Sequence, residues 1–132
     1  LTQMYKGGLF DHIGFGFSRY STDDFFLVPH FEKMLYDNAL LMMAYITAFH
    51  ITKNELFKDV AVKTATYVLR EMTDPAGGFY SAQDADSDGE EGKFYTFTYE
   101  ELTALFGEKN GNNFNEYFGI TKEGNFEGKN IP

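Results

Sequence analysis

An apolar helical segment from Phe31 to Phe49 constrains the fold of this chain more than any other feature. Its apolar side chains cover nearly the whole circumference of a helix, so almost no side is left for water. A helix of this kind must be buried between other layers of structure. Pro29 disfavours helical geometry at Val28, so we expect the chain to turn from extended to helical at this proline and the helix to be established by Phe31. Glu32 would then fall in the first turn, where the helix dipole favours a carboxylate.

The next segment, from Glu55 to Met72, is predicted to be an amphipathic helix. Apolar residues recur along it at the helical period, and charged residues fill the opposite side. Asn54 stands directly before it and is a suitable N-cap. The short connection 51–54 joins the two helices into an αα-hairpin, with one member inside the molecule and the other outside.

Shorter elements are expected on both sides of this hairpin. Residues 1–30 are rich in glycine and aromatic residues and predict loops with short strands. A β-hairpin is predicted over 78–97, with strands Phe79–Ala82 and Lys93–Phe97 around an acidic loop. The spacing Thr98-x-x-Glu101 is a capping box that opens a helix of about Tyr99 to Phe106. Residues 98–132 are otherwise expected to form short helical turns and loop.

Composition excludes several classes of function. The net charge is -9 with two arginines, which argues against nucleic acid as a partner. There is no cysteine, and hence no disulfide, thiolate metal site or redox motif. No segment has the pattern of a signal peptide or of a membrane span, so no membrane partner is expected. The compartment stays open, with the cytoplasm favoured. Because the chain begins with Leu1, we expect it to be a piece of a longer protein.

The junction between the glycine-rich region and the apolar helix is the main candidate site. It holds a group of polar residues that can carry acid–base chemistry or orient a substrate: His12, Arg19, His30, Glu32 and Asp37. The structural alternative assigns each of them a local role. In that interpretation Glu32 is a partner of the helix dipole, His30 is an N-terminal cap, and Asp37 forms a salt bridge with Lys33.

A second group is the acidic run Asp84-x-Asp86-x-Asp88-Gly89. It matches the first half of a calcium-binding EF-hand loop, but position twelve is Tyr95 and not a glutamate, and the flanking segments resemble strands. We therefore predict no metal site here and no cofactor. Two other interpretations are a solvated hairpin tip, or Asp84 and Asp86 facing a substrate pocket.

Three blocks of sequence carry a resemblance to a known family. They are Gly7–Gly14 with Gly16–Ser21, then Leu27–Ala39, then Gly77–Ser87 with Gly89–Tyr95. Together they resemble the thioredoxin-domain-containing proteins of the bacterial YyaL and animal spermatogenesis-associated protein 20 family. The resemblance covers most of the chain.

The resemblance implies a fold. Members of the family carry a thioredoxin-like domain followed by an (α/α)6 toroid of the six-hairpin glycosidase type. This chain is similar to part of the toroid only, so residues 1–132 are expected to be a mainly α fragment of that single domain with a short β-hairpin. The implied partners in the parent chain are the remainder of the toroid and the thioredoxin-like domain. A separated fragment is expected to self-associate.

The resemblance also implies roles for residues. The toroid is similar to that of N-acylglucosamine and cellobiose 2-epimerases, in which histidines at the mouths of inner helices do acid–base chemistry on a sugar. By that analogy His30 and Glu32 are the acid–base candidates and His12 is a lesser one, while Asp84 and Asp86 reach the site from the hairpin. The residues expected to hold or stack on a sugar ring are Arg19, Tyr20, Tyr36, Asp37, Phe79, Tyr80 and Gln83.

Two functions of different classes follow. The chain is part of a carbohydrate-active enzyme, either a hydrolase or an epimerase, or it is part of a non-catalytic toroid that binds a protein or glycan ligand for a thioredoxin-like neighbour. Paired carboxylates would favour hydrolysis, and paired histidines would favour epimerisation. An aromatic groove without a buried titratable pair would favour binding alone.

Overall fold

The chain is mainly helical in a computed structural model, which describes residues 1–132 with the side chain of Glu108 excepted. It divides into two compact units, residues 1–85 and residues 86–132.

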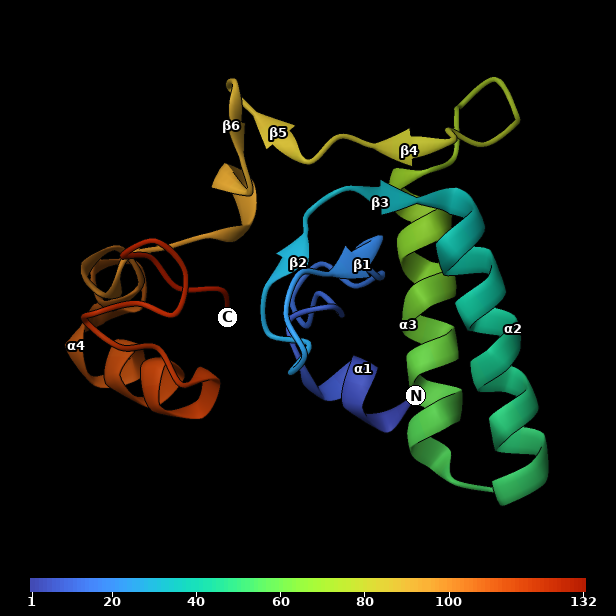
Figure 1. The fold of residues 1–132 in the computed structure, drawn as a ribbon, viewed down its shortest axis with the longest axis horizontal. Coiled ribbons are helices and arrows are strands. Elements are labelled where there is room, and N and C mark those ends of the chain that lie inside the picture. The colour runs from blue at the N-terminus through green and yellow to red at the C-terminus, as the bar shows by residue number, and fades with distance from the viewer. The chain divides into compact units, whose positions relative to one another are not determined.

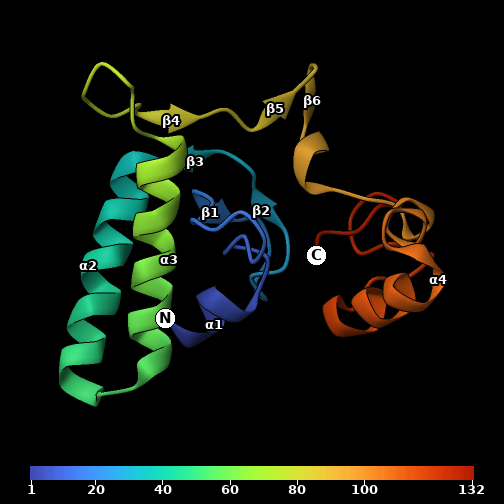
Figure 2. The ribbon, with the colours of Figure 1, turned by 180° about the vertical axis from the view of Figure 1, so that it is seen from behind.

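The predicted αα-hairpin forms the main part of the first unit. Its members are α2 (Leu35–Thr52) and α3 (Glu55–Glu71), which lie side by side (Figure 1) and are seen from behind in Figure 2. The prediction for α3 is confirmed: Asn54 caps it, because its Oδ1 accepts a hydrogen bond of 3.1 Å from the backbone N–H of Leu56. Between the helices the chain turns at Lys53, which has a left-handed backbone conformation.

The predicted start of the first helix is wrong, because α2 begins at Leu35 and not at Phe31. The residues before it are extended. The strand β2 (Pro29–His30) pairs with β1 (Tyr20–Ser21), and β3 (Lys33–Met34) pairs with β4 (Ala82–Gln83), both antiparallel. Between them Glu32 O accepts a hydrogen bond of 2.8 Å from Arg19 N. The backbone of 29–34 is thus hydrogen-bonded to segments 19–21 and 82–83, which keeps it extended, and the helix starts where this pairing ends.

The core of the first unit lies between the hairpin and the glycine-rich segment. It contains buried residues from both: Leu9, Phe10, Phe17, Tyr45, Val60 and Ala61. The ring of Phe17 stacks on that of Tyr45, with centroids 5.5 Å apart. A short helix that the sequence did not predict, α1 (Thr2–Lys6), packs Met4 and Tyr5 against this cluster. The glycine-rich segment is therefore held by aromatic packing.

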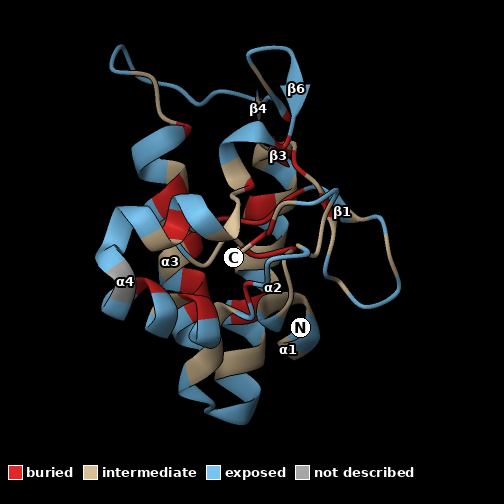
Figure 3. Ribbon diagram, turned by 90° about the vertical axis from the view of Figure 1, so that its left-hand side faces the viewer, coloured by how far each residue is buried: buried red, intermediate tan, exposed pale blue. Residues whose placement is uncertain are grey.

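Burial of the first helix on all sides is predicted for the longer protein, and within this chain α2 keeps an exposed face, as expected for a separated piece. Of the residues of α2, all of which the structure describes, Asn38 and Tyr45 are the buried ones. Leu40, Met43 and Ile46 are exposed on the outer face of α2. Figure 3 colours the chain by burial, with buried residues red and exposed residues pale blue. The physical reason is that α3 and the glycine-rich segment cover one side of α2, and no other element of the first unit covers the rest.

This outer face of α2 leads to the first testable prediction. Apolar patches of this kind mark interfaces, so we expect the separate chain to self-associate through α2, as light scattering at rising concentration would show. Met43→Glu should return it to a monomer. The control is Val62→Glu on α3, because Val62 is also exposed but lies among polar neighbours. A monomeric wild-type chain at high concentration, or equal effects of the two variants, would contradict the prediction.

The second unit contains the β-hairpin, in a shorter form than predicted. Its strands are β5 (Asp86–Ser87) and β6 (Glu90–Glu91), joined by Asp88 and Gly89, both with positive φ. An Asp-Gly pair in this conformation forms the tight two-residue turn that suits twisted hairpins. The predicted strands 79–82 and 93–97 are therefore wrong. The tight turn closes the hairpin within residues 86–91, and Lys93–Tyr95 instead forms a 3-10 turn, η1.

The rest of the second unit is α4 (Tyr99–Phe118) and the C-terminal segment. The capping box is confirmed: Glu101 N donates to Thr98 Oγ1 at 3.1 Å, and Thr98 N donates to Glu101 Oε2 at 2.7 Å. The helix extends beyond the predicted Phe106 but changes direction at Gly107, whose φ of 74° is not helical. Asn130 is fully buried and ties the C-terminal segment to Phe97 through two backbone hydrogen bonds. The toroid itself stays a prediction.

Candidate functional site

The extended segment before α2 positions the candidate site. Its side chains alternate: Phe31 and Lys33 point into the molecule and are each 2% exposed, while His30 and Glu32 are partly exposed. In an extended chain, side chains two residues apart lie on the same face, whereas in a helix they point in different directions. The strand geometry, and not the predicted helix start, therefore brings His30 beside Glu32.

Pairing with the preceding strand adds two further residues. Tyr20 is the partner of His30 in the β1–β2 ladder, and their rings stack with centroids 5.0 Å apart. Arg19 Nη1 donates a hydrogen bond of 2.8 Å to Glu32 Oε2, and His30 Nε2 lies 3.8 Å from the same oxygen. The hydrogen bond to Glu32 raises the pKa of Arg19 above its ordinary value. Glu32 is thus the centre of a charged group with an aromatic pair beside it.

The first turn of α2 completes this group with Tyr36 and Asp37. Tyr36 is close enough to Arg19 to contribute to the rise in the pKa of Arg19. Burial raises the pKa of Asp37, with a smaller opposite effect from Arg19. Six residues form what we call the surface cluster: Arg19, Tyr20, His30, Glu32, Tyr36 and Asp37.

The surface cluster combines groups that a polar ring-shaped ligand needs. It offers a stacked aromatic pair, a carboxylate held by a guanidinium, and a second carboxyl group, all partly open to solvent. A carboxylate and an imidazole within one group can bind hydroxyl groups or transfer protons. The alternative in which Asp37 pairs with Lys33 is wrong, because Lys33 points inward and binds Asp11.

The structure places the remaining predicted site residues elsewhere. His12 packs against the rings of Tyr5 and Phe10, and burial lowers its pKa. Phe79 and Tyr80 are exposed on the segment after α3, and Tyr80 donates its hydroxyl to Asp74 at 2.7 Å. The other three residues lie on or near strands.

Those three are Gln83, Asp84 and Asp86. Gln83 Oε1 accepts a hydrogen bond of 2.7 Å from the hydroxyl of Tyr67, which turns it toward the interior. Asp84 follows β4 and is exposed, whereas Asp86 is on β5 in the second unit. Among the residues that the structure describes, no three His, Asp or Glu side chains are grouped to hold a metal ion.

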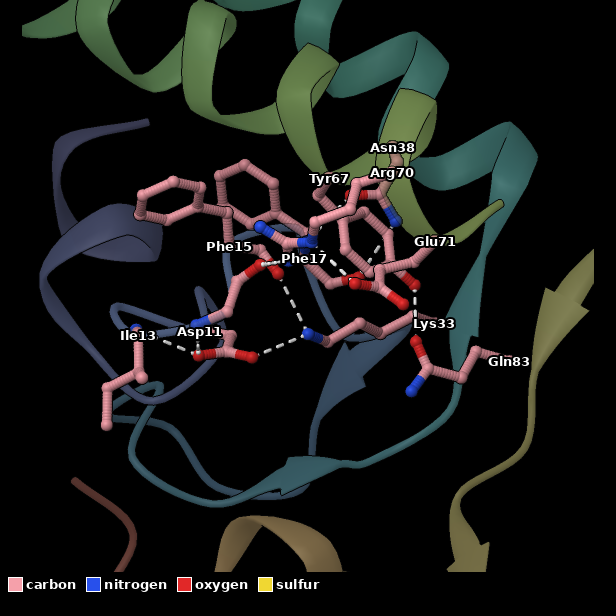
Figure 4. Close-up of polar contacts among 11 residues, drawn as sticks. Asp11, Ile13, Phe15, Phe17, Lys33, Asn38, Tyr67, Arg70, Glu71 and Gln83 are labelled. Atoms are coloured by element: carbon pink, nitrogen blue, oxygen red, sulfur yellow. Dashed lines mark hydrogen bonds and ion pairs between the residues drawn. The ribbon is translucent and has the colours of Figure 1, made fainter. Parts of the chain in front are cut away.

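An interior polar network, which sequence reasoning missed, lies on the buried face of the extended segment that carries His30 and Glu32 on its other face. Figure 4 shows Lys33 pointing inward, where its Nζ donates to Asp11 Oδ2 and to Phe15 O, each at 2.8 Å. The same ammonium lies 4.7 Å from the ring centroid of Tyr67. Asp11 also accepts from the backbone N–H groups of residues 13 and 14 through Oδ1. Burial lowers the pKa of Lys33. Strand alternation after Phe31 was the signal that could have placed Lys33 inside.

Asn38 is a second interior residue that the sequence analysis did not select. It is fully buried on α2, and its amide exchanges two hydrogen bonds with the backbone of Phe17, at 2.7 Å and 3.0 Å. Its Nδ2 also donates to Met34 O at 2.9 Å. This amide therefore fixes the start of α2 to the glycine-rich segment that leads into Arg19 and Tyr20.

Comparison with known proteins shows close relatives along the whole chain. It is 42% identical to spermatogenesis-associated protein 20 of Homo sapiens, over 100% of this chain and 19% of that protein. The protein of the same name from Mus musculus is 40% identical over the same shares, and that from Rattus norvegicus is 42% identical over 95% of this chain and 18% of the relative. The resemblance to this family is confirmed.

The chain spans about 19% of the length of the human and mouse relatives it matches. No family model matches it. Within the part of the chain that the structure describes, helices long and apolar enough to cross a membrane are absent.

Proposed function

We propose that this segment, a relative of part of spermatogenesis-associated protein 20, contributes the surface cluster to a carbohydrate-binding site in a carbohydrate-active domain. The observation that carries the proposal is the position of Glu32, which is held by Arg19 beside the stacked pair of Tyr20 and His30. In the longer protein, further hairpins of the toroid complete the site, and a thioredoxin-like domain accompanies it.

The chemistry of a sugar ring supports this ligand class. A pyranose has apolar C–H faces that pack on an aromatic ring, and hydroxyl groups around its edge that need donors and acceptors. Ligand sites generally combine apolar and aromatic surfaces with a few placed polar groups. Tyr20 and Tyr36 are each about half exposed, at 51% and 48%, and Arg19 and Glu32 supply donors and an acceptor next to them.

Among the acid–base chemistries, the cluster favours the one that uses two carboxyl groups. Glu32 and Asp37 both belong to it, and their charges affect each other, because Glu32 contributes to the raised pKa of Asp37. Glycoside hydrolysis uses a pair of carboxyl groups with different protonation states. Epimerisation by paired histidines has less support, because His12 lies in the aromatic packing around Tyr5 and His30 lies in the cluster.

A binding titration tests the proposal. We expect the full-length protein that contains this sequence to bind a neutral mono- or oligosaccharide from a panel, as measured by calorimetry. Glu32→Gln and His30→Ala should each weaken binding by about ten-fold or more, since each loses a hydrogen bond or a stacking contact. Melting temperatures should change little, because both side chains are partly exposed.

The matched control is His50→Ala. His50 is an exposed histidine in the last turn of α2, outside the cluster, so its loss should leave binding unchanged. The proposal fails if no sugar of the panel binds, or if the two cluster variants lose thermal stability in proportion to their loss of binding.

A further inference from the structure

Asp37 stands out in the surface cluster because one of its oxygens lacks a partner. Its Oδ2 is closed off from solvent and forms no hydrogen bond with any residue that the structure describes, whereas the residue as a whole is partly exposed. Buried carboxyl oxygens are normally hydrogen-bonded, and those that are not call for an explanation. The neighbouring Asn38 is fully satisfied and already fastens this turn of the helix. Asp37 lies in the first turn of α2, where the helix dipole favours a carboxylate, but this effect does not require one of its oxygens to be buried without a partner.

The charges around Asp37 do not compensate for this arrangement. Two charged groups act on Asp37, Arg19 and Glu32. His30 lies next to Glu32, and Tyr36 lies near Arg19. Among these side chains, Arg19 is the one that carries a positive charge at every relevant pH. Its Nη1 already donates a hydrogen bond to Glu32. Burial and the nearby Glu32 carboxylate both favour the neutral form of Asp37, and burial is the larger effect.

We infer that Asp37 is a ligand-binding carboxyl group, that it hydrogen-bonds a hydroxyl of a neutral, polyhydroxylated ligand, and that the chain keeps it there at a cost in stability. This inference deepens the proposed carbohydrate-binding function and rests on it. The oxygens of a carboxyl group accept hydrogen bonds from the O–H groups of a polyhydroxylated ligand, and the protonated form also donates one. Because the residue as a whole is partly exposed, a ligand can reach its carboxyl group from the solvent side.

The same arrangement selects against acidic sugars. The positive charge of Arg19 is already engaged by Glu32, so a ligand carboxylate would meet the negative charge of Glu32 without an unengaged arginine beside it. Bringing like charges together in a partly desolvated site is unfavourable. A neutral hexose is therefore expected to bind more tightly than the uronic acid with the same ring.

The test begins with stability, which needs no ligand. Asp37→Asn removes the ionisable carboxyl and should raise the melting temperature at neutral pH by about 2–5 °C. Because the folded pKa of Asp37 lies above its unfolded value, the penalty in the wild-type chain is absent below about pH 4, where both states are protonated. It grows as the pH rises from the unfolded pKa to the folded pKa and is constant above that, so the difference between variant and wild type should follow the same course. The control is Asp59→Asn on α3, which removes an ion pair with Lys63 and should not stabilise.

The second measurement is binding. Asp37→Ala should weaken binding of the neutral sugar found for the wild-type protein by about ten-fold or more, while Asp59→Ala should not change it. The inference is overturned if Asp37→Asn lowers the melting temperature, if Asp37→Ala binds as the wild type does, or if the uronic acid binds more tightly than the hexose. In those cases sugar binding by the wild type leaves the proposed function standing. Absence of any sugar binding by the wild type removes both.

Discussion

Asp11→Asn is expected to destabilise the chain by about 3–5 kcal/mol, because it removes the negative charge that is hydrogen-bonded to the buried ammonium of Lys33. The side chain of Lys33 is 2% exposed and that of Asp11 is 16% exposed, and their charged atoms are 2.8 Å apart. An asparagine keeps the oxygen that accepts from residues 13 and 14, but it has no negative charge, and its NH2 group cannot accept from Lys33. Urea unfolding monitored by circular dichroism would measure the loss.

The pH dependence of this variant identifies the cause. Burial already lowers the folded pKa of Lys33 below its unfolded value, and removal of Asp11 lowers it further. The unfolded state then binds more protons, so stability should rise as the pH increases toward about 10, the ordinary pKa of lysine. Adding Lys33→Met to the variant should restore most of the stability, because a buried pair replaced on both sides is often neutral.

The control for this prediction is Asp59→Asn. Asp59 and Lys63 form an exposed pair at 2.7 Å on α3, so the same change in charge should cost less than about 0.5 kcal/mol there. Equal losses for Asp11→Asn and Asp59→Asn would show that the interior pair has no special role.

Asn38→Ala is expected to cost about 3 kcal/mol. The change leaves the N–H and C=O of Phe17 buried without their amide partner, and each buried group left unpaired costs about 1–3 kcal/mol. The residue is fully buried, so water cannot replace the lost hydrogen bonds without a rearrangement of the start of α2. Chemical denaturation would measure the loss, and amide hydrogen exchange at Phe17 should become faster.

Asn54→Ala is the matched control. Asn54 caps α3 through one exposed hydrogen bond, and the loss of an N-cap costs about 1 kcal/mol. If Asn38→Ala costs no more than Asn54→Ala, the buried amide does not hold the glycine-rich segment to α2 as described.

Elements with local signals could be predicted from the sequence. The helix α3 and its Asn54 cap, the capping box of Thr98 and Glu101, and the mainly helical class all follow from residues close together in the chain. The family resemblance also came from contiguous blocks, and the comparison with relatives confirmed it. For the two helix starts, the residues that predict the cap also form its hydrogen bonds.

The start of α2 and the strands around it could not be predicted in this way. Apolar residues from Phe31 onward fit a helix as well as they fit a strand, and the choice depended on partners in the β1 and β4 segments. The same pairing turned Lys33 into the interior, where Asp11 and Tyr67 receive it. A charged residue is rarely buried, and the strand alternation that would place Lys33 inside can be recognised only once the segment is known to be extended.

The sequence and the tertiary structure each determined a different part of the surface cluster. The polar junction between the glycine-rich segment and the apolar helix selected Arg19, His30, Glu32 and Asp37, and the family resemblance added Tyr20 and Tyr36. Only the tertiary structure decided that His30 and Glu32 share one face, that Arg19 binds Glu32, that His12 lies elsewhere and that Asp37 has a buried oxygen without a partner. The physical reason is that side-chain direction follows backbone conformation, and the conformation of 29–34 is determined by strand pairing with residues distant in the sequence.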